Sequence, residues 1–339
     1  MLPLKNSKKK IGLIGPFANS EDLLGTWQFS NFQDKTITIE EGLLAHVDKE
    51  SLTVVKGCEI DHELEGGINE AINAAKDVDL ILLALGESSN MTGEAASKTE
   101  ISLPEPQLKL AEALSLLGKP IVLILTNGRP LLLDWFEKHM DAIVETWYLG
   151  SQAGNAISDV LFGNYNPSGK LAMSFPRKVG QIPVYYNHFN TGRPFLSDDH
   201  FTSKYLDSPI EPLYPFGFGL SYTTFEYSNL KLDKDTLNRG EQLTVSVTVQ
   251  NVGKYAGEEV VQLYIQDLVG STVRPVKELK RFDKIKLLVG EEKTIHFVLT
   301  EEDLKFYTAD LTYTAELGRF KVYVGGNSVS VSEAKFELL

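Results

Sequence analysis

The sequence predicts an α/β sandwich domain, with a mostly parallel sheet flanked by helices, followed by an all-β sandwich. Two patterns lead to this expectation. In the first half, short apolar runs alternate with stretches of helical spacing, as in a parallel sheet that is buried on both faces. In the second half, residues 243–249 alternate strictly between apolar side chains and Thr or Ser, which is typical of antiparallel strands with one buried face.

The first half contains six runs that we expect to be strands: residues 11–15, 36–39, 52–55, 79–85, 121–125 and 142–147. Helices are expected between them. An apolar stripe at helical spacing over residues 68–75 predicts one helix, and residues 155–162 before Gly163 predict another. A third helix is expected to begin at Pro104, because proline is tolerated in the first turn, and to end before Gly118.

The second half begins where periodicity fades. Between about residues 165 and 219, turn signals alternate with Tyr and Phe, so this stretch is expected to pack as a linker against a neighbour. Further runs at the spacing of a β-sandwich are residues 260–265, 294–299 and 319–324. We therefore expect an α/β domain over residues 1–175, a linker over 176–221 and an immunoglobulin or fibronectin type III-like domain over 222–339.

The composition narrows the classes of partner. The chain has 339 residues, with 33 Lys and Arg against 46 Asp and Glu, and a net charge of −13. This acidic balance argues against nucleic acid and an anionic membrane, because both need clustered basic side chains. No apolar run approaches the ~20 residues of a membrane span. Cys58 is the single cysteine and the six histidines lack metal-ligand spacing, so no disulfide, metal or cofactor is expected.

The start of the chain bears on its location. Met1, Leu2 and Pro3 lead into lysines without the hydrophobic region of a signal peptide. The sequence thus favours a cytoplasmic location over a secreted or periplasmic one. Any N-terminal signal would lie outside this chain.

The most informative segment is the polar loop over residues 86–103. It follows the expected strand 79–85 and precedes the helix that begins at Pro104. In an open α/β sheet, ligands bind beyond the carboxyl ends of the strands, so this loop occupies the place of an active site. Glu94 is its strongest candidate for chemistry, because a loop over a strand end can hold a carboxylic acid against a leaving group.

Other side chains compete with Glu94, and a glutamate in an arbitrary loop is usually only solvated. Glu87 directly ends the strand and could bind backbone amides or contact substrate. Glu100 could simply favour the positive N-terminus of the following helix. Lys98 is a candidate for supporting the site. Trp27 could stack against a sugar ring, although packing in the core is the commoner fate of a tryptophan.

Nucleotide binding and a serine-nucleophile site are rival functions for an α/β domain. The turn after the first expected strand has Gly12, Gly15 and Pro16 instead of the Gly-x-Gly-x-x-Gly fingerprint, and residues 97–99 lack the glycine of a P-loop. No Gly-x-Ser-x-Gly elbow occurs. Residues 127–130, Asn-Gly-Arg-Pro, end the next strand: the arginine could face an acidic partner, or the segment could be a plain turn.

Motifs along nearly the whole chain are shared with one known family. Glu94, Lys98, Leu103, Pro104 and Gln107 have the spacing of its acid/base loop, although Lys98 stands where arginine is more common. Further matching motifs are residues 11–16, 24–27, 159–163, 166–171, 174–176, 182–187, 190–194, 214–225, 251–253, 256–264 and 278–282. Together these motifs resemble the C-terminal part of glycoside hydrolase family 3, the β-glucosidase and β-xylosidase family.

The resemblance implies an active site that this chain would share with a missing domain. In that family an N-terminal TIM barrel supplies an aspartate nucleophile and most contacts to the sugar, and this sequence has no room for it. Glu94 would be the general acid/base, with Glu87, Lys98 and Trp27 in supporting or substrate-binding positions. The nucleophile would be absent from this chain, so the chain alone is expected to be inactive on a β-glucoside or oligosaccharide.

Two functions from different classes remain open. The first is the C-terminal portion of a retaining β-glucosidase, or of a β-xylosidase, that hydrolyses terminal β-D-glucosides. The second is a non-catalytic carbohydrate-contacting or structural module of a multidomain or split glycosidase. An in-frame barrel encoded upstream would favour the first. The glycone, the linkage and the oligomeric state stay open, and a homodimer is among the assemblies that the sequence allows.

Overall fold

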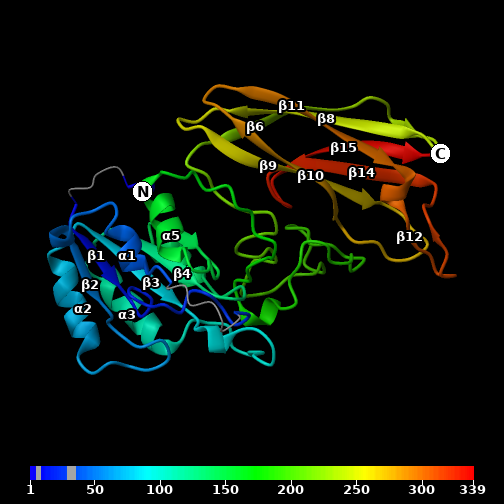
Figure 1. Ribbon diagram of the computed structural model, residues 1–339. Helices are drawn as coiled ribbons and strands as arrows, with labels where there is room; N and C mark the ends of the chain where they lie inside the picture. The colour runs from blue at the N-terminus through cyan, green and yellow to red at the C-terminus, as the bar shows by residue number, and fades with distance from the viewer. Residues whose placement is uncertain (5–8, 29–35) are drawn as a thin grey trace. The chain divides into compact units, whose positions relative to one another are not determined.

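The computed structural model describes residues 1–4, 9–28 and 36–339 (Figure 1). The chain divides into two compact units, Met1–Tyr165 and Asn166–Leu339. The first holds a parallel sheet with helices and the second holds mainly antiparallel sheets, so the predicted fold class is confirmed. The finer division at residues 175 and 221 stays a prediction.

The first unit is built on a five-stranded parallel sheet in the order β2-β1-β3-β4-β5. Its strands are β1 (Ile11–Ile14), β2 (Leu52–Val55), β3 (Leu80–Gly86), β4 (Ile121–Thr126) and β5 (Ala142–Glu145). Every residue of β1, β3 and β4 is buried, as expected where helices cover both faces. The parallel register brings the carboxyl ends of β3, β4 and β5 to one edge of the sheet.

The helices of this unit are α1 (Ile39–Leu43), α2 (Gly67–Lys76), α3 (Glu105–Ser115), α4 (Asp134–His139) and α5 (Ala153–Phe162), with 3₁₀ turns η1 (Lys49–Ser51) and η2 (Ser89–Met91). Helices α1 and α5 pack together on one face of the sheet, where Leu82, Ile124 and Ile157 belong to one buried cluster. Helices α2 and α3 pack together and lie on the other side of the sheet in Figure 1.

Three elements of this unit differ from the sequence-based expectation. The run 36–39 is not a strand, because Thr38 and Glu41 form a capping box, with bonds of 3.2 and 3.0 Å, that starts α1 despite the β-branched residues. Strand β5 ends at Glu145, because Trp147 has a left-handed backbone with φ 50°. Helix α4 has six residues, too few to show a clear periodicity, and is not predicted.

The second unit contains a β-sandwich. Its strands are β6 (Phe225–Leu232), β7 (Thr236–Leu237), β8 (Gln242–Asn251), β9 (Gly257–Asp267), β10 (Glu278–Leu287), β11 (Glu292–Thr300), β12 (Phe306–Tyr307), β13 (Tyr313–Thr314), β14 (Gly318–Gly325) and β15 (Val331–Leu338), with 3₁₀ turns η3 (Val179–Gln181) and η4 (Glu301–Leu304). One sheet has the order β10-β9-β14-β15-β7 and the other β11-β8-β6, while β12 and β13 form a short hairpin.

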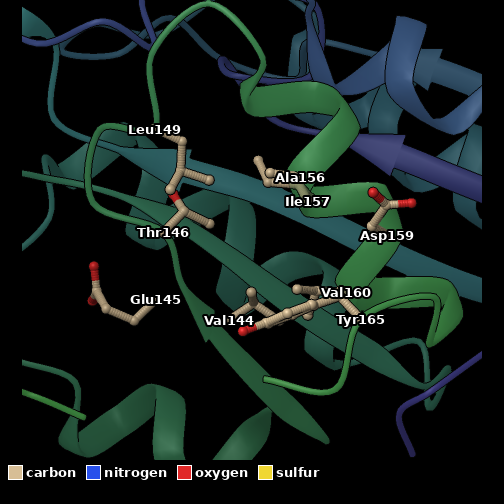
Figure 2. A pocket seen from close by; sticks show the side chains of 9 residues that line it. All are labelled: Val144, Glu145, Thr146, Leu149, Ala156, Ile157, Asp159, Val160 and Tyr165. Carbon is tan, nitrogen blue, oxygen red and sulfur yellow. The ribbon is translucent and has the colours of Figure 1, made fainter. Parts of the chain in front are cut away.

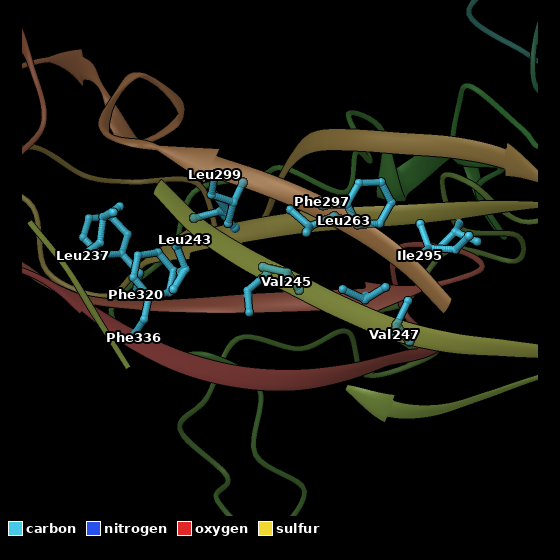
Figure 3. Close-up of a cluster of buried hydrophobic side chains, with 14 of the residues drawn as sticks. Leu237, Leu243, Val245, Val247, Leu263, Ile295, Phe297, Leu299, Phe320 and Phe336 are labelled. Carbon is cyan, nitrogen blue, oxygen red and sulfur yellow. The ribbon is translucent and has the colours of Figure 1, made fainter. Parts of the chain in front are cut away.

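The core of the sandwich lies between its two larger sheets. In β8 the predicted alternation is observed, since every second residue from Leu243 to Val249 is buried. Figure 3 shows Leu243, Val245 and Val247 pointing into the same core as Leu263 of β9 and Phe297 of β11. The alternation read from the sequence is therefore the buried face of a sandwich strand.

Residues 166–224 precede β6 and belong to the second unit. They contain little regular structure beyond η3 and an isolated bridge between Phe175 and Tyr214. Lys170 pairs with Glu259 of β9 at 3.1 Å, so this segment is tied to the sandwich by charge. No helix in the ranges that the structure describes is long and apolar enough to cross a membrane.

Candidate active site at the carboxyl end of β3

The loop after β3 begins with a buried carboxylate. Glu87 directly follows the strand, and its side chain is 0% exposed. Its Oε1 accepts a hydrogen bond from Lys98 Nζ at 2.9 Å, and its Oε2 accepts one from Arg129 Nε at 3.2 Å. A buried carboxylate is costly unless it is paired in this way. Both oxygens of Glu87 are thus occupied by cations of the same chain.

Arg129 reaches the loop from the end of β4. Its Nη2 donates to the carbonyl oxygen of Ala96 at 2.8 Å and to that of Met91. Asn127 Nδ2 donates to the carbonyl oxygen of Arg129 at 2.7 Å and holds its backbone in turn. Of the two interpretations of residues 127–130, the one in which the arginine faces an acidic partner is confirmed, and that partner is Glu87.

Side chains from two other segments hold the rest of the loop. The Tyr148 hydroxyl donates to the carbonyl oxygen of Glu87 at 2.8 Å, and burial raises the pKa of Tyr148 to about 12, so it remains a donor at neutral pH. Thr26 Oγ1 donates to the carbonyl oxygen of Thr92 at 2.6 Å. Gly93 packs against this threonine: its φ is 96°, and a β-carbon there would lie 2.8 Å from Thr26 Cβ.

Glu94 lies between these anchors. It is exposed, and the residues on either side, Gly93 and Ala95, have positive φ values of 96° and 59°. Its carboxylate has no hydrogen bond or ion pair with any residue that the structure describes. The loop therefore carries these side chains in different states: Glu87 and Lys98 form an ion pair, and Glu94 is exposed.

The remaining predicted residues lie near the loop or beside it. Trp27 is 74% exposed, so the core-packing interpretation does not hold for this chain, and its neighbour Thr26 binds the loop. Glu100 accepts hydrogen bonds from Ser102 Oγ at 2.8 Å and from Ser102 N at 3.2 Å, which lower the pKa of its carboxyl group. Glu100 thus braces the turn that leads to α3.

Gln107 binds the backbone of Gly86, the last residue of β3, a role that the sequence analysis did not assign to it. Its Oε1 accepts from Gly86 N at 2.8 Å, and its Nε2 donates to the carbonyl oxygens of Gly86 at 2.8 Å and Ile60 at 2.7 Å. Gly86 is needed there, because a β-carbon would lie 1.8 Å from the carbonyl oxygen of Thr126. The sequence signal was the fixed spacing of Gln107 after Pro104, but its partners become visible only in the fold.

A second buried carboxyl group lies at the end of β5. Burial raises the pKa of Glu145 to about 8, against the opposing effect of hydrogen bonds from the Trp147 N–H and the Asn127 amide. Its Oε1 accepts from Trp147 N at 3.2 Å. Its Oε2 and Asn127 Oδ1 are buried and have no hydrogen-bond partner among the residues described. Glu145 therefore holds a proton at neutral pH.

A cavity of about 400 Å³ lies beside β5 and α5 (Figure 2). Thr146, Leu149, Ile157 and Tyr165 are among its lining side chains, and Figure 2 shows the Glu145 side chain pointing away from them. No residue of the loop 87–98 lines this cavity. In the described part of the chain, no three His, Cys, Asp or Glu side chains are grouped so as to hold a metal ion.

Known proteins resemble the chain over its whole length. A periplasmic beta-glucosidase of Salmonella typhimurium is 44% identical over 100% of this chain and 47% of its own length. A beta-xylosidase of Formosa agariphila is 41% identical over 97% of this chain and 46% of its own. The crystal structure of a beta-glucosidase from Listeria innocua in complex with glucose has a TM-score of 0.95 at 44% identity, over 100% of this chain and 47% of that one. The chain spans about half the length of the curated relatives it matches.

The expectation of a cytoplasmic location is wrong. The Salmonella relative, which is 44% identical across the full chain, is a periplasmic beta-glucosidase by name, and this finding overturns the expectation. The error has a simple cause. A signal peptide is found only at the N-terminus of a whole protein, and the relatives extend well beyond the part that this chain matches.

The family follows from the sequence profiles and the fold together. Residues 1–222, more than half of the chain, match the glycosyl hydrolase family 3 C-terminal domain. Residues 259–328 match a fibronectin type III-like domain, and they lie within the observed β-sandwich. The chain therefore belongs to glycoside hydrolase family 3, of which it contains the C-terminal α/β domain and the fibronectin type III-like domain.

Proposed function

We propose that this chain is the C-terminal portion of a retaining β-glucosidase and that Glu94 is its general acid/base. The observation that carries the proposal is an exposed carboxylate with no partner among the described residues, on a loop anchored at the carboxyl end of the central strand β3. A retaining glycosidase needs one carboxyl group that donates and recovers a proton, with a second about 5–5.5 Å away that attacks the sugar.

The proposed reaction takes place with an aspartate nucleophile on the N-terminal TIM barrel that the resemblance implies. Glu94 donates its proton to the glycosidic oxygen while the bond from that oxygen to C1 breaks and the nucleophile bonds to C1. The Glu94 carboxylate then removes a proton from the water that attacks C1, while the bond from C1 to the aspartate breaks. This step releases glucose with retained configuration and returns both carboxyl groups to their starting states.

The neighbours of Glu94 have supporting roles in this proposal. Glu87 and Lys98 satisfy each other's charge beneath the loop, so they act on its shape rather than on the sugar. Trp27 is exposed next to Thr26, where it could stack on a sugar ring. A barrel that covers Glu94 would desolvate its carboxyl group and raise its pKa toward the working pH, as a general acid requires.

Terminal β-D-glucosides are the proposed substrates, and the periplasm or the exterior is the proposed location. The Salmonella relative is a periplasmic beta-glucosidase by name, and the Listeria enzyme was crystallised with glucose and, as a variant, with laminaribiose. Because the Formosa relative is a beta-xylosidase by name, β-xylosides are the substrates against which β-glucosides should be compared. Light scattering of the intact enzyme would show whether it is a homodimer, one of the assemblies that the sequence leaves open.

The acid/base role is tested in the intact enzyme, with the N-terminal half encoded upstream. Glu94→Gln should lower kcat on cellobiose by about 10²–10⁴-fold, because its leaving group needs protonation. An aryl glucoside with a strongly acidic phenol should form the glycosyl-enzyme with a much smaller loss. The matched control is Glu100→Gln, an exposed glutamate near the end of the same loop. Wild-type turnover of cellobiose by Glu94→Gln would remove Glu94 from this role.

The need for a second domain is tested on this chain alone. Without a nucleophile, purified protein should show no hydrolysis of an aryl β-glucoside above buffer, because proton donation alone leaves most of the barrier in place. Clear turnover that a β-glucosidase inhibitor abolishes would contradict the division of the active site. Inactivity of the intact enzyme on all glycosides would instead favour the non-catalytic module.

A further inference from the structure

We propose that Arg129 is the positioning residue for the acid/base: it fixes the backbone on both sides of Glu94, and thereby the place from which Glu94 donates its proton. This inference rests on the proposed function of Glu94. It assigns the placement of that carboxyl group to a side chain at the end of the neighbouring strand β4, which itself touches none of the reacting atoms.

One guanidinium group ties three parts of the loop together. Its Nε lies 3.2 Å from Glu87 Oε2 at the start of the loop. Its Nη2 donates to the carbonyl oxygen of Met91, before Glu94, and to that of Ala96, after it, at 2.8 Å. Only residues 92–95 lie between these two carbonyl groups. A segment this short, held at both ends, has little freedom to move its catalytic side chain.

Glu94 depends on this constraint because its carboxylate is not held by a hydrogen bond or ion pair within the residues that the structure describes. The position of this carboxylate therefore follows from the backbone alone. The adjacent Ala95 has φ 59°, a conformation that a residue with a β-carbon adopts only when its surroundings impose it. A displacement of a catalytic group by about 1 Å can lower the rate by about 10²-fold.

Lys98 does not duplicate the role of the arginine. Its Nζ donates to Glu87 Oε1 at 2.9 Å and serves the charge of that carboxylate. Arg129 presents a planar fork whose donors reach a carboxylate and two carbonyl groups at once, which a single ammonium group on a flexible stem cannot do. Arg129 is also the only arginine in residues 1–165. Arg129→Lys should therefore keep the charge but lose the fixed loop.

The first test uses this chain and does not depend on catalysis. A glutamyl endopeptidase should cut after the exposed Glu94 at least about tenfold faster in Arg129→Lys than in wild type, because cleavage follows local opening of the loop. The matched control is Lys109→Ala, which removes exposed ion pairs with Glu63 and Glu105 outside the loop. Equal cleavage rates in wild type and Arg129→Lys would contradict the proposal.

The second test uses the intact enzyme. Arg129→Lys should lower kcat on cellobiose by about 10²-fold and leave KM within about threefold, since a displaced acid affects the chemical step more than binding. Millimolar guanidinium should restore part of the activity of Arg129→Ala, and ammonium should not. An unchanged kcat in Arg129→Lys would overturn the proposal, and so would a loss shared equally by activated aryl glucosides, which need no acid.

A double variant separates failure of this inference from failure of the proposed function. If Arg129 acts through Glu94, then Arg129→Lys should add little loss to Glu94→Gln. A full additional 10²-fold loss would mean that the arginine acts elsewhere. If Glu94→Gln alone left cellobiose turnover intact, the proposed function would fail. If Glu94→Gln lost cellobiose turnover while Arg129→Lys kept it, only the positioning role would fail.

Discussion

Each unit of the molecule contains a buried carboxylate that is paired with at least one cation. The two carboxylates differ in the part of the structure to which their partners belong. Glu87 pairs with Lys98 and Arg129, both of which belong to or bind the loop that carries Glu94. Glu259 of β9, 6% exposed, pairs with Lys170 at 3.1 Å and accepts a hydrogen bond from the Tyr227 hydroxyl at 2.8 Å.

The surroundings of Glu259 are those of a structural contact. Tyr227 belongs to β6 of the opposite sheet, and burial together with the charge of Glu259 raises the pKa of its hydroxyl group. The contact thus joins two sheets and the segment that precedes them. In the first unit, by contrast, the partners of Glu87 anchor the loop that carries the exposed Glu94. A buried ion pair alone therefore does not mark a candidate site; the loop that it anchors does.

The first prediction compares the loss of stability when the buried carboxylate of each unit, Glu87 or Glu259, is replaced. Glu87→Gln should lower the free energy of unfolding of this chain by about 3 kcal/mol, because it leaves two cations around an uncharged amide. Glu259→Gln should cost less, about 2 kcal/mol, and should not change kcat in the intact enzyme. Urea unfolding measures both free energies. The control is Glu63→Gln, in an exposed pair with Lys109, which should leave the unfolding midpoint nearly unchanged. A larger activity loss from Glu259→Gln than from Glu87→Gln would reverse the comparison.

An effect of similar size is expected from pH at the end of β5. The pKa of Glu145 is about 8 in the folded protein, against 4.5 as the ordinary value, so the folded state binds more protons between these limits. Stability should therefore fall as the pH rises from about 4.5 to about 8, by about 4 kcal/mol. In Glu145→Gln this decline should flatten, whereas Glu70→Gln, exposed on α2, should follow wild type. Parallel curves for wild type and Glu145→Gln in thermal unfolding from pH 5 to 8 would contradict this expectation.

The smallest effect is expected from separating the β-sandwich. Residues 222–339 should fold alone, since their strands share one buried core. Far-ultraviolet circular dichroism should show a β-sheet spectrum and a cooperative melt. A random-coil spectrum would mean that the proposed boundary at residue 222 is wrong and that contacts such as Lys170 with Glu259 are required.

The fold was predictable where the pattern is local. Continuous apolar runs indicated β3 and β4, and strict alternation indicated β8, because these patterns follow directly from how many faces of a strand are buried. The run 36–39 misled because its β-branched residues favour a strand, while the capping box of Thr38 and Glu41 starts a helix.

The candidate site was predictable only in part. Spacing pointed to Glu94 and to its loop, but the small polar residues of that loop would also suit a mobile segment. The side chains that anchor it, Arg129 and Tyr148, come from the ends of β4 and β5. The sequence offered an acidic partner for Arg129 as one interpretation, but it could not identify the residue, because the register of the parallel sheet brings the partners together.

The central claim is that Glu94 is the acid/base, and azide tests it most directly. In the intact enzyme, Glu94→Gln should form the glycosyl-enzyme from an activated aryl glucoside but hydrolyse it slowly, since no base assists water. Azide needs no base and should restore turnover, giving β-glucosyl azide, identified by NMR, that neither wild type nor Glu100→Gln produces. Glu94→Gln that made no azide adduct and hydrolysed cellobiose at the wild-type rate would contradict the account.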